Sequence, residues 1–199
     1  RFSVQPFAWI VYAPLLVALH RRGGRRRHLA LFAVLVVAFH LAVGKIITAP
    51  LSFVFTPLFA LPFAAAAWIS VSLSAAAWRR LGPRAGTYLF PALVVAFEWF
   101  FSTLTSQSSW GSMAFNQSQN LSLLQATTFF GIGGVSFLVA LGSSLAASVL
   151  SRGARANRPD LAVFLVLFTG VHLYGELRLA AGLPGKPIAL ACVVSPFSA

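Results

Sequence analysis

The sequence has few charged residues and almost no acidic ones. Of its 199 residues 9% are charged, and it has three Asp or Glu against 15 Lys or Arg. The hydrophobic fraction is 58% and the mean hydropathy is +0.83. A composition this apolar excludes an ordinary soluble domain. The net charge of +12 does not indicate a nucleic-acid-binding protein, because the basic residues flank hydrocarbon-length segments and do not cover a polar face.

Several residue patterns that carry chemistry are also missing. Cys192 is the only cysteine, so no intrachain disulfide can form, and we interpret it as a small buried hydrophobic residue. The four histidines lack the spacing of a metal site, and we interpret His40 and His172 as hydrogen-bonded helix residues. The glycines at 131–134 follow no strand, which argues against a dinucleotide fingerprint. Ser136 lacks the following glycine of a nucleophile elbow. The sequence therefore predicts no metal and no cofactor.

Long apolar runs dominate what is present. A helix needs about 20 apolar residues to cross the roughly 30 Å hydrocarbon layer of a bilayer. The chain offers six such segments, so we predict an all-α polytopic membrane protein with about six transmembrane helices. The third segment is too long for one straight crossing, and its Pro57 and Pro62 predict a bend or an interfacial start. The predicted transmembrane domain is 1–182, with spans at 2–19, 29–47, 51–78, 87–104, 127–150 and 161–180.

The positions of the basic residues predict the orientation of these spans. Basic turns at 21–28, 79–84 and 152–158 follow the first, third and fifth spans and contain eleven arginines. Basic residues near span ends are retained on the cytoplasmic side, so the last span should end on the outer side. Residues 187–194 read as a buried β-strand after a Gly/Pro-punctuated linker, and 183–199 is expected to begin another domain.

The centre of the chain contains a succession of motifs. Residues 98–101 read Glu-Trp-Phe-Phe, and residues 109–117 read Ser-Trp-Gly-Ser-Met-Ala-Phe-Asn-Gln. Residues 131–138 follow as Gly-Ile-Gly-Gly-Val-Ser-Phe-Leu. In this order they resemble the membrane portion of the apolipoprotein N-acyltransferases, and the similarity covers essentially the whole chain. The chain departs from the family where Phe101 or Ser102 replaces a basic residue, and where Phe115-Asn116 replaces a Tyr-Ser pair.

The resemblance implies an enzyme that takes an acyl chain from a membrane phospholipid and passes it to the N-terminal amine of a lipoprotein. In this family a nitrilase-like domain on the outer face supplies a Cys nucleophile, a Glu base and an oxyanion-stabilising Lys. Those positions lie beyond Ala199. The resemblance thus implies a chain truncated at both ends, with no catalytic residue and no activity by itself.

The resemblance also implies a cellular location and a set of partners. The protein is expected to be a monomeric, multi-pass protein of the bacterial inner membrane, with its C-terminal end on the periplasmic side. Its implied partners are membrane phospholipid and, in the intact enzyme, a lipoprotein substrate, with no nucleic acid. Residues 183–199 would be the linker and first strand of the nitrilase-like domain.

Glu98 is the first candidate site residue, because it is the only carboxylate within a central apolar run. An ionisable group there is costly unless it is paired or hydrated, and such groups are often functional. Two interpretations stay open: a structural hydrogen bond, which we favour, and direct contact with substrate.

The loop at 105–120 is the second candidate. It is rich in Ser, Asn and Gln and carries aromatic residues of the kind that lie at membrane interfaces. It is expected either to close over a lipid substrate or to form an aromatic-belt turn with helix caps. The candidate substrate-binding residues are Glu98, Trp110, Met113, Phe115, Asn116 and Gln117.

Two further features have structural interpretations. Gly131, Gly133 and Gly134 are expected to let membrane helices approach closely. The arginine cluster at 21–27 is expected to fix topology, with the binding of anionic lipid headgroups as the alternative.

Two other functions stay open. A membrane-bound carbon–nitrogen hydrolase would share the scaffold and use another acceptor. A small transporter would also have about six spans, but it would usually show an internal repeat or broken helices near the midplane. No convincing repeat is found in the sequence.

Overall fold

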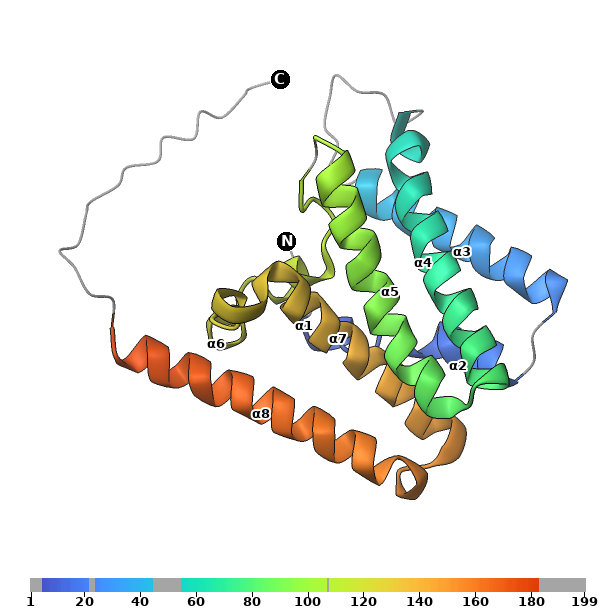
Figure 1. Ribbon diagram of the computed structural model, residues 1–199. Coiled ribbons are helices and arrows are strands. Elements are labelled where there is room, and N and C mark those ends of the chain that lie inside the picture. The colour runs from blue at the N-terminus through green and yellow to red at the C-terminus, as the bar shows by residue number, and fades with distance from the viewer. Residues whose placement is uncertain (1–4, 22–23, 45–54, 107, 183–199) are drawn as a thin grey trace.

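The computed structural model describes residues 5–21, 24–44, 55–106 and 108–182, and this part of the chain is helical without a strand (Figure 1). Five segments are long and apolar enough to cross a bilayer, namely α3, α4, α5, α7 and α8 with the turn before it. The fold is therefore that of an all-α polytopic membrane protein, which confirms the predicted fold class. The helices are α1 (Gln5–Ala8), α2 (Ala13–Arg21), α3 (Arg25–Gly44), α4 (Thr56–Arg80), α5 (Pro83–Leu104), α6 (Leu121–Leu124), α7 (Thr127–Arg152) and α8 (Arg158–Ala180), with 3-10 turns η2 (Met113–Gln117) and η3 (Arg155–Asn157).

The first predicted span, residues 2–19, is not one continuous helix. The structure has the short helix α1, a turn at residues 9–12 and then α2. Pro14 lies in the first turn of α2, where its missing N–H is tolerated but would interrupt a helix arriving from α1. The turn places Trp9 beside α8, where its ring packs edge-on against Phe168 at a centroid distance of 5.3 Å.

The third predicted span corresponds to α4. This helix begins at Thr56, with Pro57 in its first turn, and continues through Pro62 to Arg80. Its expected start at residue 51 lies outside the described residues. The same holds for Cys192 and for the predicted linker and strand within 183–199.

Small residues let the central helices approach closely. Buried alanines and serines line α4 and the second half of α7. The Ser74 hydroxyl of α4 donates to the Gly86 carbonyl of α5 at 2.8 Å, and the Ser144 hydroxyl of α7 donates to the Thr87 carbonyl at 2.7 Å. Interhelical hydrogen bonds of this kind satisfy hydroxyls that lipid could not. These contacts join α4, α5 and α7 into one bundle.

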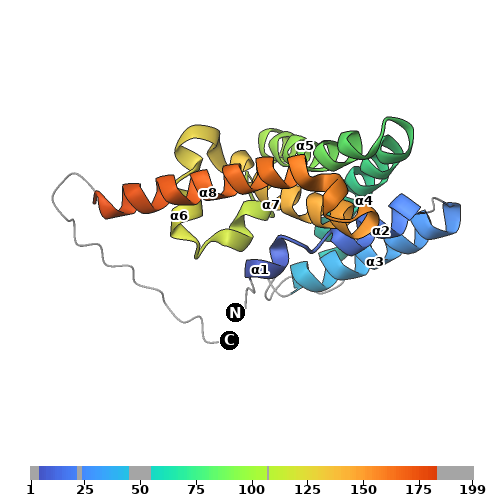
Figure 2. The same cartoon turned by 90° about the horizontal axis from the view of Figure 1, so that it is seen from below.

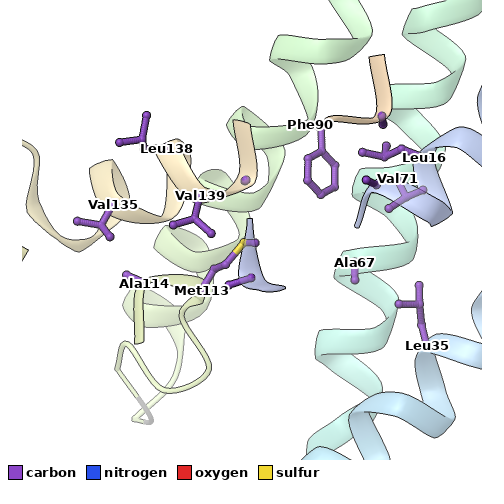
Figure 3. Close-up of a cluster of buried hydrophobic side chains, with 14 of the residues drawn as sticks. Leu16, Leu35, Ala67, Val71, Phe90, Met113, Ala114, Val135, Leu138 and Val139 are labelled. Carbon is purple, nitrogen blue, oxygen red and sulfur yellow. The ribbon is translucent and has the colours of Figure 1, made fainter. Parts of the chain in front are cut away.

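The core of this bundle forms around Phe90. Its side chain is fully buried on α5 and lies near Leu16 of α2 and Val71 of α4 (Figure 3). Met113 from the loop and Val139 from α7 belong to the same cluster. The loop after α5 is thus part of the hydrophobic core, which fixes its position relative to three helices.

Helix α8 lies along the edge of the bundle and extends past α7 toward α6 (Figures 1 and 2). Only Asp160 and Gly175 of its described residues are buried. Gly175 packs directly on α6, because a Cβ atom built there would lie 2.0 Å from the Ser122 carbonyl oxygen. The contact between α8 and α6 therefore requires glycine at this position.

Gly175→Ala is expected to destabilise the protein by about 1–3 kcal/mol, because the added methyl overlaps the α6 backbone. Gly170→Ala on the same helix is the matched control, since no heavy atom lies within 4 Å of its Cβ position. Thermal unfolding of the purified chain in detergent should show a lower midpoint for Gly175→Ala alone. Equal midpoints for the two variants would contradict this packing.

Candidate functional site

A cavity of about 700 Å³ lies among α3, α4, the C-terminal half of α5, the start of α7, the loop that follows α5 and the turn at 9–12. Its walls are mostly aromatic and aliphatic, and no Lys, Arg or His side chain of the described residues lines it. Glu98 is the only charged residue of its lining, and serines and Asn116 supply most other polar groups. The principal wall residues are Phe39, Phe63, Val95, Phe97, Phe101, Trp110, Met113, Phe130 and Ile132.

Glu98 binds the loop with both of its carboxylate oxygens. Oε1 accepts the Met113 backbone N–H at 2.7 Å, and Oε2 accepts the Ser112 hydroxyl at 2.9 Å. Hydrogen bonds to an ionisable acceptor are strong, more so where little water competes. Glu98 therefore holds the chain reversal after α5 against its own helix.

Ser136 of α7 completes the anchoring of the loop. Its hydroxyl oxygen accepts the Ala114 backbone N–H at 3.1 Å and lies 3.0 Å from the Ser112 hydroxyl oxygen. Since the Ser112 hydroxyl donates to Glu98, the Ser136 hydroxyl is left to donate to Ser112. Glu98, Ser112 and Ser136 thus form one chain of hydrogen bonds from α5 through the loop to α7.

Sequence reasoning missed this role of Ser112 and Ser136. It rejected Ser136 as a nucleophile but did not ask what a fully buried hydroxyl in an apolar helix would bond. The available signal was a serine within a buried helix face, following a loop whose backbone donors also needed acceptors.

Trp110 and Met113 lie in the cavity wall. The Trp110 ring stands edge-on to Phe63 of α4, with a centroid distance of 5.4 Å and an interplanar angle of 70°. The next residue, Gly111, has a φ of 82°, and a Cβ there would lie 2.6 Å from the Phe63 ring. Glycine is thus needed both for the turn and for the approach of Trp110 to α4.

The remaining predicted loop residues have different surroundings. Asn116 lines the cavity and donates from Nδ2 to the Met113 carbonyl at 3.2 Å. Phe115 is 52% exposed and is not part of the lining. Gln117 is 1% exposed and points away, accepting the Trp9 indole N–H at 3.3 Å and donating to the Gln5 carbonyl at 3.1 Å. Gln117 therefore joins the loop to α1.

Gly131 does not act as a close-packing residue, and that expectation is wrong for it. Its φ of 61° and ψ of −169° interrupt α7, and no heavy atom lies within 4 Å of its Cβ position. Phe130 and Gly131, which lie at this interruption of the helix, line the cavity. Gly133 fits the expectation better, since its Cβ position lies 3.2 Å from a Val95 methyl.

Polar contacts also hold the C-terminal end of α8 against the segment that contains α6. His172 Nε2 lies 3.2 Å from Asn120 Nδ2, and the Ser122 hydroxyl donates to Glu176. His172 also bonds the Phe168 carbonyl within its own helix, and His40 bonds the Thr56 hydroxyl at 2.8 Å. Both histidines are thus hydrogen-bonded helix residues as predicted. Among the described residues no group of three His, Cys, Asp or Glu side chains is arranged to hold a metal.

Glu98→Ala is expected to release the loop, because the Met113 N–H and the Ser112 hydroxyl lose their acceptor. Hydrogen exchange at Met113 should accelerate about ten-fold or more, as the loss of buried hydrogen bonds predicts. Glu98→Gln keeps a carbonyl acceptor and should have a smaller effect. Thr103→Ala is the control, since that hydroxyl bonds only carbonyls of its own helix. Unchanged exchange in Glu98→Ala would refute the anchoring role.

Comparisons with known proteins relate this cavity to a family. Residues 1–145, which include every described residue of the cavity wall, match the family described as apolipoprotein N-acyltransferase N-terminal domain. The chain is 27% identical to a protein named apolipoprotein N-acyltransferase from Geobacter metallireducens, over 96% of this chain and 39% of the relative. It thus spans about two fifths of that relative's length. No solved structure matches the chain significantly. With the match extending over most of its helices, the chain belongs to the apolipoprotein N-acyltransferase N-terminal domain family.

Proposed function

We propose that this chain is the lipid-binding membrane portion of an enzyme that moves an acyl chain from a phospholipid to the N-terminal amine of a lipoprotein. The observation that carries the proposal is the cavity of about 700 Å³, which has apolar walls and a polar loop at one side. The family membership and the name of the Geobacter relative support the same reaction.

The composition of the cavity wall favours an acyl chain over a polar ligand. Each methylene transferred from water into an apolar site contributes about 0.8 kcal/mol, so phenylalanine and valine walls suit a hydrocarbon. The polar positions, Ser102, Ser108, Ser109 and Asn116, gather on the loop side and would face the ester and glycerol part of a lipid. A lipid bound in this way presents its ester close to the outer membrane surface.

The candidate residues receive separate roles in this proposal. Trp110 and Met113 contact the acyl chain, and Asn116 bonds the polar end of the lipid. Phe115, with its exposed ring, lies at the lipid interface outside the cavity. Glu98 and Gln117 are positioning residues, since their polar atoms bond the loop and α1.

The chemistry itself is proposed to come from a nitrilase-like domain of the intact protein. Its Cys thiolate would attack the lipid ester, forming a thioester and releasing a lysophospholipid. The lipoprotein amine would then attack the thioester, forming the amide and regenerating the thiol. The membrane portion would hold the donor where water is scarce enough for the amine to compete.

We further propose the location of the protein within the cell. The end of the bundle that carries the basic turns would face the cytoplasm, because basic residues are retained there. The cavity and the C-terminal end of α8 would then lie on the periplasmic side of a bacterial inner membrane. The protein is proposed to act as a monomer.

Occupation of the cavity by an acyl chain can be tested with a phospholipid that carries a photoactivatable diazirine in its acyl chain. Irradiation should label residues of the cavity wall in the purified chain. Val95→Trp, which fills the cavity, should reduce this labelling several-fold, because little space is left for the chain. Val166→Trp is the control, since Val166 is 71% exposed on α8. Equal labelling in both variants would overturn the assignment.

The reaction can be tested in membranes of a bacterium that lacks lipoprotein N-acylation. The complete gene product should convert a diacylated lipopeptide to its N-acylated form, and mass spectrometry should show the added acyl group. The chain alone should give no product, because it holds none of the proposed nucleophilic machinery. Turnover by the chain alone would refute the proposed division of roles. Release of free fatty acid or ammonia without lipopeptide acylation would favour a hydrolase with another acceptor.

A further inference from the structure

The end of the bundle opposite the cavity carries a dense set of exposed arginines. The end of α4, the start of α5, the end of α7 and the start of α8 lie at this end, and the N-terminal end of α3 lies farther out beside α4 (Figure 1). All nine arginine side chains described at these helix ends are exposed. We call this set the arginine face; it consists of Arg25, Arg26, Arg27, Arg79, Arg80, Arg84, Arg152, Arg155 and Arg158.

The protein itself supplies almost no negative charge to this face. The chain has three acidic residues, and Glu98 and Glu176 are at the opposite end of the bundle. Only Asp160 is here, where it accepts from Arg84 Nε at 3.4 Å and from the Tyr88 hydroxyl at 3.1 Å. One aspartate against nine arginines leaves a large excess of positive charge at this end of the bundle. Mutual repulsion among them makes negatively charged groups from outside favourable.

The arginine face is built on fixed helix ends. The Arg84–Asp160 contact joins α5 to α8, and the His20 ring of α2 stacks on Trp78 of α4 at 3.8 Å. Within the turn between α7 and α8, the Ser148 hydroxyl donates to Asn157 Oδ1 at 2.5 Å. Asn157 in turn donates to the Gly153 carbonyl at 2.8 Å. Arg152, Arg155 and Arg158 therefore extend from a turn whose backbone is held in place.

The residue type points to phosphate. Retention in the cytoplasm needs only positive charge, which lysine supplies equally well. Both lysines of the chain, Lys45 and Lys186, fall outside the basic turns, so arginine accounts for all the Lys and Arg positions of those turns. The planar guanidinium donates two parallel hydrogen bonds to a phosphate, which lysine cannot do.

The apolar neighbours of these arginines point to a membrane surface. Leu81 lies in the turn between α4 and α5 and is 77% exposed, and Leu150 lies two residues before the end of α7 and is 64% exposed. Side chains of this kind suit the acyl region below a lipid headgroup, and they would be unfavourable against a soluble polyanion such as nucleic acid. Phosphate groups of lipids are available at this depth.

We propose that the arginine face binds anionic phospholipid headgroups of the leaflet it borders. Arg152, Arg155 and Arg158 donate paired hydrogen bonds to the lipid phosphates. This site is separate from the cavity, whose described wall holds no cation. Basic residues near an anionic membrane surface are attracted to it, and the attraction weakens as salt screens it. Anionic lipid would thus hold the basic ends of the helices at one depth.

The test is thermal unfolding of the purified chain in a neutral detergent. Added phosphatidylglycerol or cardiolipin should raise the unfolding midpoint by roughly 5 °C more than phosphatidylcholine does. The difference should shrink at high salt, and inorganic phosphate alone should not reproduce it. Equal shifts for anionic and zwitterionic lipids would overturn the proposal, and so would protection by inorganic phosphate alone.

Variants locate the site and separate charge from geometry. The triple variant Arg152→Gln/Arg155→Gln/Arg158→Gln should lose most of the anionic-lipid shift, whereas Arg178→Gln at the opposite end should keep it. The triple change to Lys preserves the charge that membrane insertion requires and should lose about half of the shift. A full shift in the Gln variant would place the site elsewhere. A full shift in the Lys variant would refute the recognition of phosphate by paired hydrogen bonds from arginine.

Discussion

The end of the bundle that holds the cavity depends on one carboxylate. Glu98 lies on an otherwise apolar helix, and both of its oxygens bond the chain that folds back after α5. Backbone N–H groups at membrane depth have to find acceptors within the protein, because lipid offers none. The carboxylate satisfies one such donor and the Ser112 hydroxyl, and Ser136 satisfies another donor from α7. The loop is held by polar bonds inside an apolar core.

The packing of the helices on either side of Glu98 explains why the cavity lies at this end of the bundle. Small residues bring α4, α5 and α7 into close contact near the basic end, where serine hydroxyls bond neighbouring backbones. At the end that holds the cavity the helices carry phenylalanines, and α7 is interrupted at Gly131. Large rings that meet edge-on leave more space than interlocked alanines and serines do. A bundle that is tight at one end therefore stays open at the other.

Charge is distributed along the same axis. The cavity wall has one acidic group and no cation among the described residues, whereas the opposite end has nine exposed arginines and one aspartate. Under the proposed function the outer end handles an acyl chain, for which neutral walls are suitable. The basic end would be held by lipid phosphates. Under these two proposals, the surface for lipid phosphates and the cavity for the acyl chain lie at opposite ends of the bundle.

Hydropathy predicted the membrane-spanning class, charge placement grouped the arginines in three turns, and a succession of short motifs carried the family resemblance. These are properties of local composition and order, and they survive whatever the helices do in space. Only the tertiary structure decided that residues 9–12 break the first span, that Gly131 interrupts α7, and that Gln117 serves α1 while Trp110 lines the cavity. The bond between Gln117 and Trp9 joins residues distant in the chain, as does the bond between Ser136 and a loop backbone 22 residues away. Spacing within one segment holds no information about such a partner, because a hydrogen bond between distant residues forms only after the helices have packed.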